Sequence, residues 1–354
     1  MVVAGRPVAG VDYPGTYAQL LVWFPDDLAC LDYLDWLRWG EGFACPACGC
    51  SESWRLSGGQ RSCAGCARRC SPTAGTIFHR TRTPLTVWFA AAWFVTSQKD
   101  GASALGLQRV LGLGSYETAW AMLHRLRSAM VRSGRDKLAG DVEVDETAIG
   151  GVKPGKRGRG AAGKTLVAVG VERKSPKGFG RCRLQVIPDA TAPSLRRFLL
   201  ENIEPGSLLL TDGLKSYPAA VGMDYSHKPV NVAGSSLPAH VPLPGVHRIA
   251  SLVKRWLLST HQGAVEGDHL QAYLDEFCFR FNRRAARRRG LLFYRLLEQA
   301  VRSEPLRYSD LVVAPGRPKH TPPTPPQTKR VAAGSLSGPR GDHPWRRGQA
   351  SATS

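Results

Sequence analysis

The chain has 354 residues, with 48 lysines and arginines against 28 aspartates and glutamates, and a net charge of +20 at neutral pH. This length accommodates two or three domains, and the charge is typical of a protein that binds a polyanion such as nucleic acid; a basic but inert surface is the alternative. The longest apolar run, 87–95, is far below the roughly 20 residues of a membrane span, and no signal-peptide pattern opens the chain, so we expect a cytoplasmic, nucleoid-associated protein with no membrane partner.

Residues 26–40 are predicted to form a helix. Pro25 precedes it, and Asp26 and Asp27 suit a helix N-terminus. An apolar stripe follows at a spacing of three, made of Leu28, Leu31, Leu34 and Leu37. We expect this stripe to pack in a core, and we assign residues 1–40 to an N-terminal helical segment.

The cysteines are concentrated in one short stretch, because six of the nine fall between positions 45 and 70. This clustering indicates a metal site rather than disulfides. Two Cys-x-x-Cys pairs offer four thiolates for a closed tetrahedral Zn²⁺ site, namely Cys45, Cys48, Cys63 and Cys66. Cys50 and Cys70 remain alternative ligands. We expect a zinc ribbon over 41–75 that is either purely structural or, through Arg55, Arg61, Arg68 and Arg69, in contact with DNA.

Residues 76–136 are predicted to be helical. Aromatic residues at roughly helical spacing follow Pro84 and favour a packed core: Trp88, Phe89, Trp93 and Phe94. Two further helices are expected within 101–130, joined by the glycine turn 111–114, which is the outline of a helix-turn-helix. Its second helix would expose a basic side formed by His124, Arg125, Arg127 and Arg132. We therefore assign a DNA-binding role to this segment, with an ordinary helical hairpin as the alternative.

Two predicted strands each deliver an aspartate to a glycine turn. Residues 141–151 alternate acidic and apolar residues and carry Asp145 to a glycine pair, and the apolar run from 208 carries Asp212 to Gly213. Mg²⁺ prefers hard oxygen ligands, and two such ions about 3.5–4 Å apart can bind the attacking and leaving oxygens of a phosphoryl transfer. The sequence thus predicts a divalent-metal site that acts on DNA.

The segment between the two aspartates contains a phosphate-loop pattern at 158–165. That motif requires a helix after it, whereas the strand-like run 166–171 follows here, so the nucleotide-binding interpretation is disfavoured. The favoured interpretation is a basic hairpin that carries lysines and arginines toward phosphates: Lys153, Lys156, Arg157, Arg159 and Lys164.

The order of predicted elements indicates an α/β catalytic domain over 137–300. Strands are expected at 142–147, 166–172, 181–187 and 207–211, a helix at 192–202, an irregular segment at 213–244, and helices at 246–260 and 268–287. Three strands, a helix, a strand and a helix are the order of an RNase H-like mixed sheet. Residues 315–354 are rich in proline, glycine and basic residues without periodicity, so we expect a disordered tail there.

These features together resemble the bacterial insertion-sequence transposases that carry an N-terminal zinc ribbon and an RNase H-like catalytic domain of the DDE type. The resemblance covers about residues 25–300, in the order of the family. Its motifs are the two cysteine pairs, 73–78, 118–127, 144–147, 211–213, 246–248, 254–257, 260–263, 273–277 and 279–284. It implies metal-dependent cleavage and strand transfer at the ends of a mobile element. The implied partners are double-stranded DNA, as terminal inverted repeats and target, and further copies of the chain.

The third metal ligand departs from the usual pattern of DDE enzymes. Many of these enzymes place a glutamate on a helix where this chain has His247, 35 positions after Asp212, with a lysine seven positions later that is Lys254 here. The resemblance implies that this family group varies the third position, so the histidine is compatible with an active enzyme. The resemblance implies that Asp145, Asp212 and His247 hold the ions and that Lys254 positions a phosphate. Imidazole is softer than carboxylate and suits Mn²⁺ at least as well as Mg²⁺. The alternative carboxylates are Glu143, Glu276 and, less favoured because its side chain alternates with that of Asp145, Glu146.

Two other functions fit the same sequence. An RNase H-like repair nuclease would need the same metals without recognition of element ends. A decayed or domesticated copy would only bind DNA, and the histidine at position 247 is compatible with that alternative.

Overall fold

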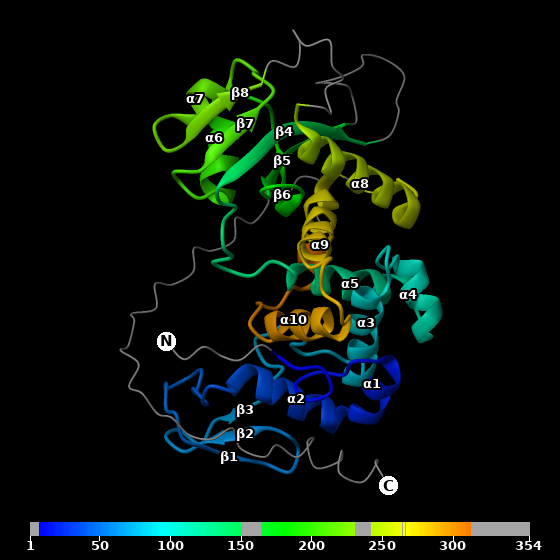
Figure 1. Ribbon diagram of the computed structural model, residues 1–354. Coiled ribbons are helices and arrows are strands. Elements are labelled where there is room, and N and C mark those ends of the chain that lie inside the picture. The colour runs from blue at the N-terminus through cyan, green and yellow to red at the C-terminus, as the bar shows by residue number, and fades with distance from the viewer. Residues whose placement is uncertain (1–6, 151–163, 231–241, 264, 266, 313–354) are drawn as a thin grey trace.

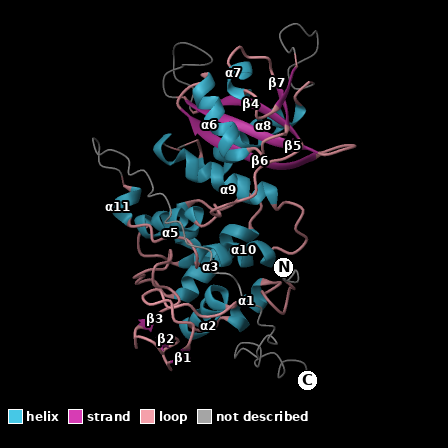
Figure 2. Ribbon diagram, turned by 90° about the vertical axis from the view of Figure 1, so that its left-hand side faces the viewer, coloured by secondary structure: helices cyan, strands magenta, loops and turns pink. Residues whose placement is uncertain are grey.

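The computed structural model describes residues 7–150, 164–230, 242–263, 265 and 267–312. Figure 1 shows a body of helices with a small sheet at one end of the molecule and a larger sheet at the other. The long helix α9 (Leu270–Asn282) lies between the larger sheet and the helical body. Both views agree on this arrangement (Figure 2).

The helical body begins with α1 (Tyr17–Trp23) and α2 (Asp27–Trp39). Asp26 caps α2, because its Oδ1 accepts a hydrogen bond from the backbone N–H of Ala29 at 2.9 Å. The predicted helix is confirmed almost to the residue. Leu34 and Leu37 of its leucine stripe are buried, whereas Leu28 is about half exposed.

The small sheet is antiparallel, in the order β1 (Ser53–Arg55), β2 (Arg61–Cys63) and β3 (Arg69–Cys70). Ion pairs to α2 hold it in place: Arg55 binds Asp32, and Arg61 binds both oxygens of the buried Asp35 at 2.7 and 2.6 Å. Two of the four arginines that we expected to contact DNA are therefore occupied by acidic partners within the chain. Arg68 and Arg69 are exposed.

Three further helices follow: α3 (Leu85–Ser97), α4 (Ala104–Leu111) and α5 (Tyr116–Ser128). The α4–α5 turn has the predicted form, with Gly112 in the left-handed region at φ 61° and Ser115 capping α5. Residues Trp88, Phe89 and Trp93 are buried in the core, as predicted. The same core contains the buried face of α10 (Gly290–Ala300), a helix that we expected within the 137–300 unit but that packs against α2 and α3.

The prediction of an exposed basic side on α5 is wrong, because this side of the helix packs against α9. His124 and Arg127 are each 2% exposed, Arg125 is partly buried, and Arg132 is exposed. Burial, followed by the positive charge of Arg127, lowers the pKa of His124 to about 3, so its imidazole is neutral at pH 7. Arg127 donates from Nε to Oε2 of the fully buried Glu276 on α9 at 2.8 Å.

The larger sheet has five strands in the order β6-β5-β4-β7-β8. Its members are β4 (Asp141–Ile149), β5 (Thr165–Arg173), β6 (Phe179–Ile187), β7 (Leu208–Thr211) and β8 (Ser226–Pro229). The first three form an antiparallel meander, and β7 and β8 run parallel to β4. With α6 (Ala192–Asn202) between β6 and β7, this topology is RNase H-like, and the predicted fold class is confirmed.

The prediction that residues 213–244 are irregular is wrong for the first half of this segment. It contains the short helix α7 (Tyr217–Val221) and the edge strand β8. Neither showed a periodic pattern, because α7 has only five residues and β8 is polar with a proline at its end, which an edge strand tolerates. The phosphate-loop pattern is followed by β5 rather than a helix, and most of the predicted basic hairpin lies outside the described residues.

The two faces of the larger sheet have separate cores. Val142 and Val144 of β4 pack toward α6 and α7, whereas Ile149, at an even spacing from Glu143 and Asp145, packs with α8 (Pro244–His261) and α9. The carboxylates of positions 143 and 145 therefore share the face covered by α8.

Two short elements complete the described chain: the 3-10 turn η1 (Gly267–His269) and α11 (Tyr308–Leu311).

The basic run 280–289 is only partly available to a ligand. Arg280 donates to the carbonyl oxygens of residue 95, in the last turn of α3, and of residues 98 and 99, just after that helix. Arg284 donates to the carbonyl oxygens of residues 179 and 180. Arg283 lies 4.0 Å from the ring of Phe279. Arg287, Arg288 and Arg289 are exposed.

No helix in the described part of the chain combines the length and the apolar character that crossing a bilayer needs.

Candidate active site

The two predicted aspartates lie on neighbouring parallel strands: Asp145 is in the middle of β4, and Asp212 directly follows β7. The β4–β7 ladder pairs Asp141 with Leu208 and Glu143 with Leu210. The same register, continued past the end of β7, sets Asp212 level with Asp145. Neighbouring strands are about 4.8 Å apart, so the backbones of the two aspartates lie side by side at the centre of the sheet.

Tyr217 of α7 is affected by the negative charges of the carboxylates on these two strands. It is fully buried, and its hydroxyl donates to Oε1 of Glu146 at 2.6 Å. Burial raises its pKa well above the usual value, and the negative charges of Glu146, Asp145 and Asp212 add to the effect. Glu146 thus points toward α7, on the opposite face of β4 from Asp145, as strand alternation predicts.

The helix that carries His247 is fixed to β4 by Glu143. The Glu143 carboxylate is fully buried, and its Oε2 accepts the backbone N–H groups of Gly245 and Val246 at 2.6 and 3.1 Å, in the first turn of α8. A carboxylate is stabilised at this position because the first turn of a helix leaves its N–H groups without intrahelical partners. A Cβ at Gly245 would come within 2.8 Å of the same oxygen, so this close approach requires glycine.

The predicted site residues His247 and Lys254 both lie on α8. His247 directly follows Val246, the second residue that Glu143 contacts, and Lys254 lies two turns further along the helix. Burial, followed by the positive charge of Lys164, lowers the pKa of Lys254, while the Asp145 carboxylate opposes that shift. The ammonium group of Lys254 therefore interacts electrostatically with the Asp145 carboxylate. In the described residues, however, Asp145, Asp212 and His247 do not form a group whose ligand atoms all lie within 4.8 Å of one another.

Glu276 is unsuited to close the metal site. It is buried between α9 and α5 in the ion pair with Arg127, and Glu143 is held at the start of α8. The sequence showed neither the ion pair of Glu276 nor the contact of Glu143 with α8, although the period-two alternation did place Glu143 on the same face as Asp145. The contact between Tyr217 and Glu146 was also missed, because Tyr217 falls in the segment that lacked a periodic pattern.

The four predicted zinc ligands converge on one point. The sulfur atoms of Cys45, Cys48, Cys63 and Cys66 all lie within 4.8 Å of one another. Two of the separations are 3.7 Å, for Cys45 and Cys66, and 3.5 Å, for Cys48 and Cys63. A tetrahedron with Zn–S bonds of about 2.3 Å has edges of about 3.8 Å, so the donor set fits this ion.

Backbone N–H groups support thiolate chemistry at this centre. The amides of Ala47 and Cys48 lower the pKa of the Cys45 thiol to about 6, in the tight turn between the first two ligands. The alternative ligands Cys50 and Cys70 are not members of the converging group. Cys70 is instead buried in the small core beneath it.

Two family models match the chain. The transposase zinc-ribbon domain matches residues 25–69, and the ISXO2-like transposase domain matches residues 137–282. The chain belongs to the insertion-sequence transposases with an N-terminal zinc ribbon. It is therefore a DNA transposase, and the family expected from the sequence motifs is confirmed.

Comparison with solved structures finds a crystal structure of a pre-cleavage Mos1 transpososome. The identity is 13%, the match covers 60% of the transposase and 75% of that chain, and the TM-score is 0.25. No curated protein matches the chain. Both family matches include predicted ligands: the first contains the four cysteines, and the second contains the two aspartates, His247 and Lys254.

Proposed function

We propose that this transposase cleaves and joins DNA strands at the ends of an insertion sequence, with Asp145, Asp212 and His247 binding Mg²⁺ or Mn²⁺. The observation that supports the proposal is the level placement of Asp145, in the middle of β4, and Asp212, directly after β7. Two carboxylates side by side on neighbouring strands supply the hard oxygen ligands that these ions prefer. Bound there, the ions would supply charge stabilisation to an in-line displacement at phosphorus.

The residues around the aspartates would hold substrate and ligands in position. Lys254, close to Asp145, would bind a non-bridging phosphate oxygen at the element end. Tyr217 would keep Glu146 turned toward α7 and away from the DNA-facing side. Glu143 would fix the first turn of α8 and thereby the approach of His247 to the aspartates. No covalent link between the chain and DNA is needed.

We expect His247 to set the metal preference. Substitution His247→Ala should remove most cleavage, whereas His247→Glu should retain it and shift the preference from Mn²⁺ toward Mg²⁺, because a hard oxygen replaces the imidazole. The measurement is cleavage of an element-end duplex by each variant with each metal. Wild-type cleavage by His247→Ala, together with an inactive Glu146→Gln, would show that Glu146 rather than His247 completes the site.

The cysteine centre is proposed to hold a structural Zn²⁺. The substitution Cys48→Ser should abolish zinc binding and unfold the ribbon, because such sites supply much of the folding free energy of their module. Cys50→Ser is the matched control, since Cys50 is outside the converging group. Elemental analysis should find one zinc per chain in wild type and in the control, and none in Cys48→Ser. A full zinc content in Cys48→Ser would refute the ligand assignment.

Double-stranded DNA and further copies of the chain are the proposed partners, since two element ends must be held together for strand transfer. A repair nuclease would cleave duplexes without regard to the terminal sequence, and a decayed copy would bind DNA without cleaving it. Cleavage assays on terminal and scrambled duplexes therefore separate the three functions. Terminal inverted repeats around the encoding gene would support the transposase function directly.

A further inference from the structure

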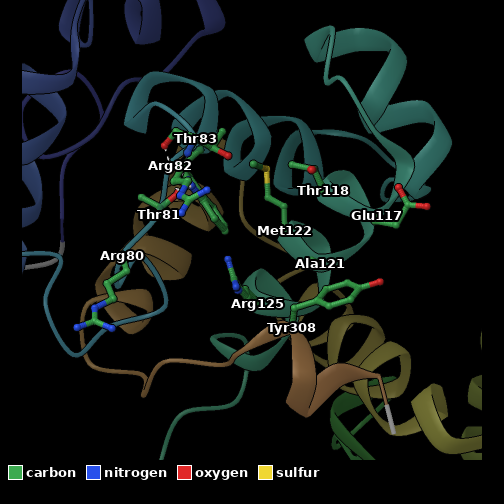
Figure 3. Close-up of a pocket in the computed structure, with 11 residues that line it drawn as sticks. Arg80, Thr81, Arg82, Thr83, Glu117, Thr118, Ala121, Met122, Arg125 and Tyr308 are labelled. Carbon is green, nitrogen blue, oxygen red and sulfur yellow. Dashed lines mark hydrogen bonds between the residues drawn. The ribbon is translucent and has the colours of Figure 1, made fainter. Parts of the chain in front are cut away.

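A cleft of about 380 Å³ lies beside the second helix of the helix-turn-helix. One wall is the chain segment 80–83, the other is the face of α5 that includes Thr118 and Arg125, and Tyr308 of α11 closes one side. Figure 3 shows Arg80 and Arg82 on one side of this space, with Arg125, Met122 and Thr118 across from them. The cleft is distant in sequence from every residue assigned to the metal sites.

The lining of the cleft is basic. Three arginines and one acid, Glu117, contribute a net charge of about +2. Arg80 and Arg82 are exposed, and within the described residues their side chains form no ion pair and no hydrogen bond to the protein. Arg125 is held in place, because its Nε donates to the carbonyl oxygen of Leu306 at 2.8 Å, which leaves its two terminal nitrogens to other partners.

The backbone of the first wall is also unusual. Arg80 has φ 53°, in the left-handed region that side chains with a Cβ disfavour. Its neighbour Thr81 is fixed by the buried Trp88, whose indole N–H donates to the threonine hydroxyl at 2.8 Å. The turn that presents the two arginines is therefore anchored to the core of the helical body.

We propose that this cleft binds the phosphodiester backbone of one DNA strand while the N-terminal residues of α5 approach the groove. In helix-turn-helix proteins the N-terminal part of the second helix reaches the base edges, and flanking groups bind phosphates. Here Tyr116, Glu117 and Thr118 are exposed at that end of α5, directly beside the arginines. Guanidinium groups and threonine hydroxyls are common phosphate donors, and the guanidinium bonds are strengthened by charge.

This inference rests on the proposed action on DNA, and it assigns the cleft beside α5 as the place where the helical segment binds a DNA strand. Of the basic side expected on α5, the cleft uses only Arg125, because His124 and Arg127 are buried. The cleft is too small for a duplex, so it is suited to the backbone of a single strand rather than to base pairs.

The test compares the double variant Arg80→Gln/Arg82→Gln with the control Arg197→Gln. Arg197 is exposed on α6, also without a side-chain partner in the described residues, and it belongs to the other end of the molecule. Binding to fluorescein-labelled terminal and scrambled duplexes is measured by anisotropy over a range of salt concentrations, without divalent metal. The double variant should bind both duplexes at least about tenfold more weakly, with a log–log salt slope smaller by roughly two.

Substitution of the same residues by lysine should restore most of the affinity, because lysine keeps the positive charge; this rescue separates a phosphate contact from a folding defect. Unchanged affinity and salt slope in the glutamine double variant would overturn the proposal, and so would a loss confined to the terminal duplex with an unchanged slope. Wild-type protein that neither binds nor cleaves DNA would instead refute the proposed function itself.

Discussion

Replacing either Asp145 or Asp212, on the neighbouring strands β4 and β7, is expected to remove DNA cleavage. Asp145→Asn and Asp212→Asn keep the size of each side chain but remove the negative charge that binds a divalent ion. Charge stabilisation by such ions is worth several kcal/mol, so each variant should lose about a thousandfold or more in the rate of cleavage. The measurement is single-turnover cleavage of an element-end duplex with Mg²⁺ or Mn²⁺.

Asp141→Asn is the matched control for these two variants. Asp141 begins the same strand, is exposed, and lies four residues before Asp145. It should cleave like wild type, and all three variants should bind DNA at least as well as wild type without metal, since each removes a negative charge. Wild-type cleavage by Asp145→Asn would exclude a metal-binding role for that residue.

Removing one partner of the buried ion pair between α5 and α9 is expected to give the largest loss of stability. Arg127 is 2% exposed and Glu276 is fully buried, so Glu276→Ala leaves a buried guanidinium without its counter-charge. A change of this kind typically costs about 3–5 kcal/mol of unfolding free energy. Chemical denaturation of the zinc-loaded protein would measure it.

The double variant Arg127→Met/Glu276→Leu is the control for that experiment. It removes both charges and keeps apolar volume, and such replacements are often neutral or stabilising. It should therefore be far more stable than Glu276→Ala. If Glu276→Ala unfolds at the same denaturant concentration as wild type, the pair does not hold the helical body to the catalytic domain.

Patterns with strong local causes were predictable from the sequence. The cap at Asp26, the glycine turn before Ser115 and the alternation of β4 each depend on neighbouring residues, and the structure has all three. The cysteine pairs were equally clear, because their spacing is dictated by a tetrahedral ion. The two aspartates were selected as candidates because Asp145 lies on an alternating strand that ends at a glycine pair and Asp212 directly follows an apolar strand.

The features that were missed depend on long-range contacts. His124 and Arg127 look like a basic surface in the sequence, and only the packing of α9 against α5 buries them. Arg61 and Arg280 likewise look like phosphate ligands in the sequence, but in the fold Arg61 pairs with Asp35 and Arg280 binds carbonyl groups at the C-terminal end of α3. Ion pairs between residues far apart in the chain leave no periodic signal.

The central claim is that Asp145 binds a divalent ion during cleavage, and exchange of its carboxylate for a thiolate tests that claim most directly. Asp145→Cys presents a soft ligand that Mg²⁺ binds poorly and that Mn²⁺ accepts more readily. The measurement is cleavage of an element-end duplex by this variant and by Asp141→Cys with each metal. Asp145→Cys should be inactive with Mg²⁺ and regain cleavage with Mn²⁺, whereas Asp141→Cys should be active with both. Cleavage by Asp145→Cys at the wild-type rate with Mg²⁺ would contradict a metal-binding role for Asp145.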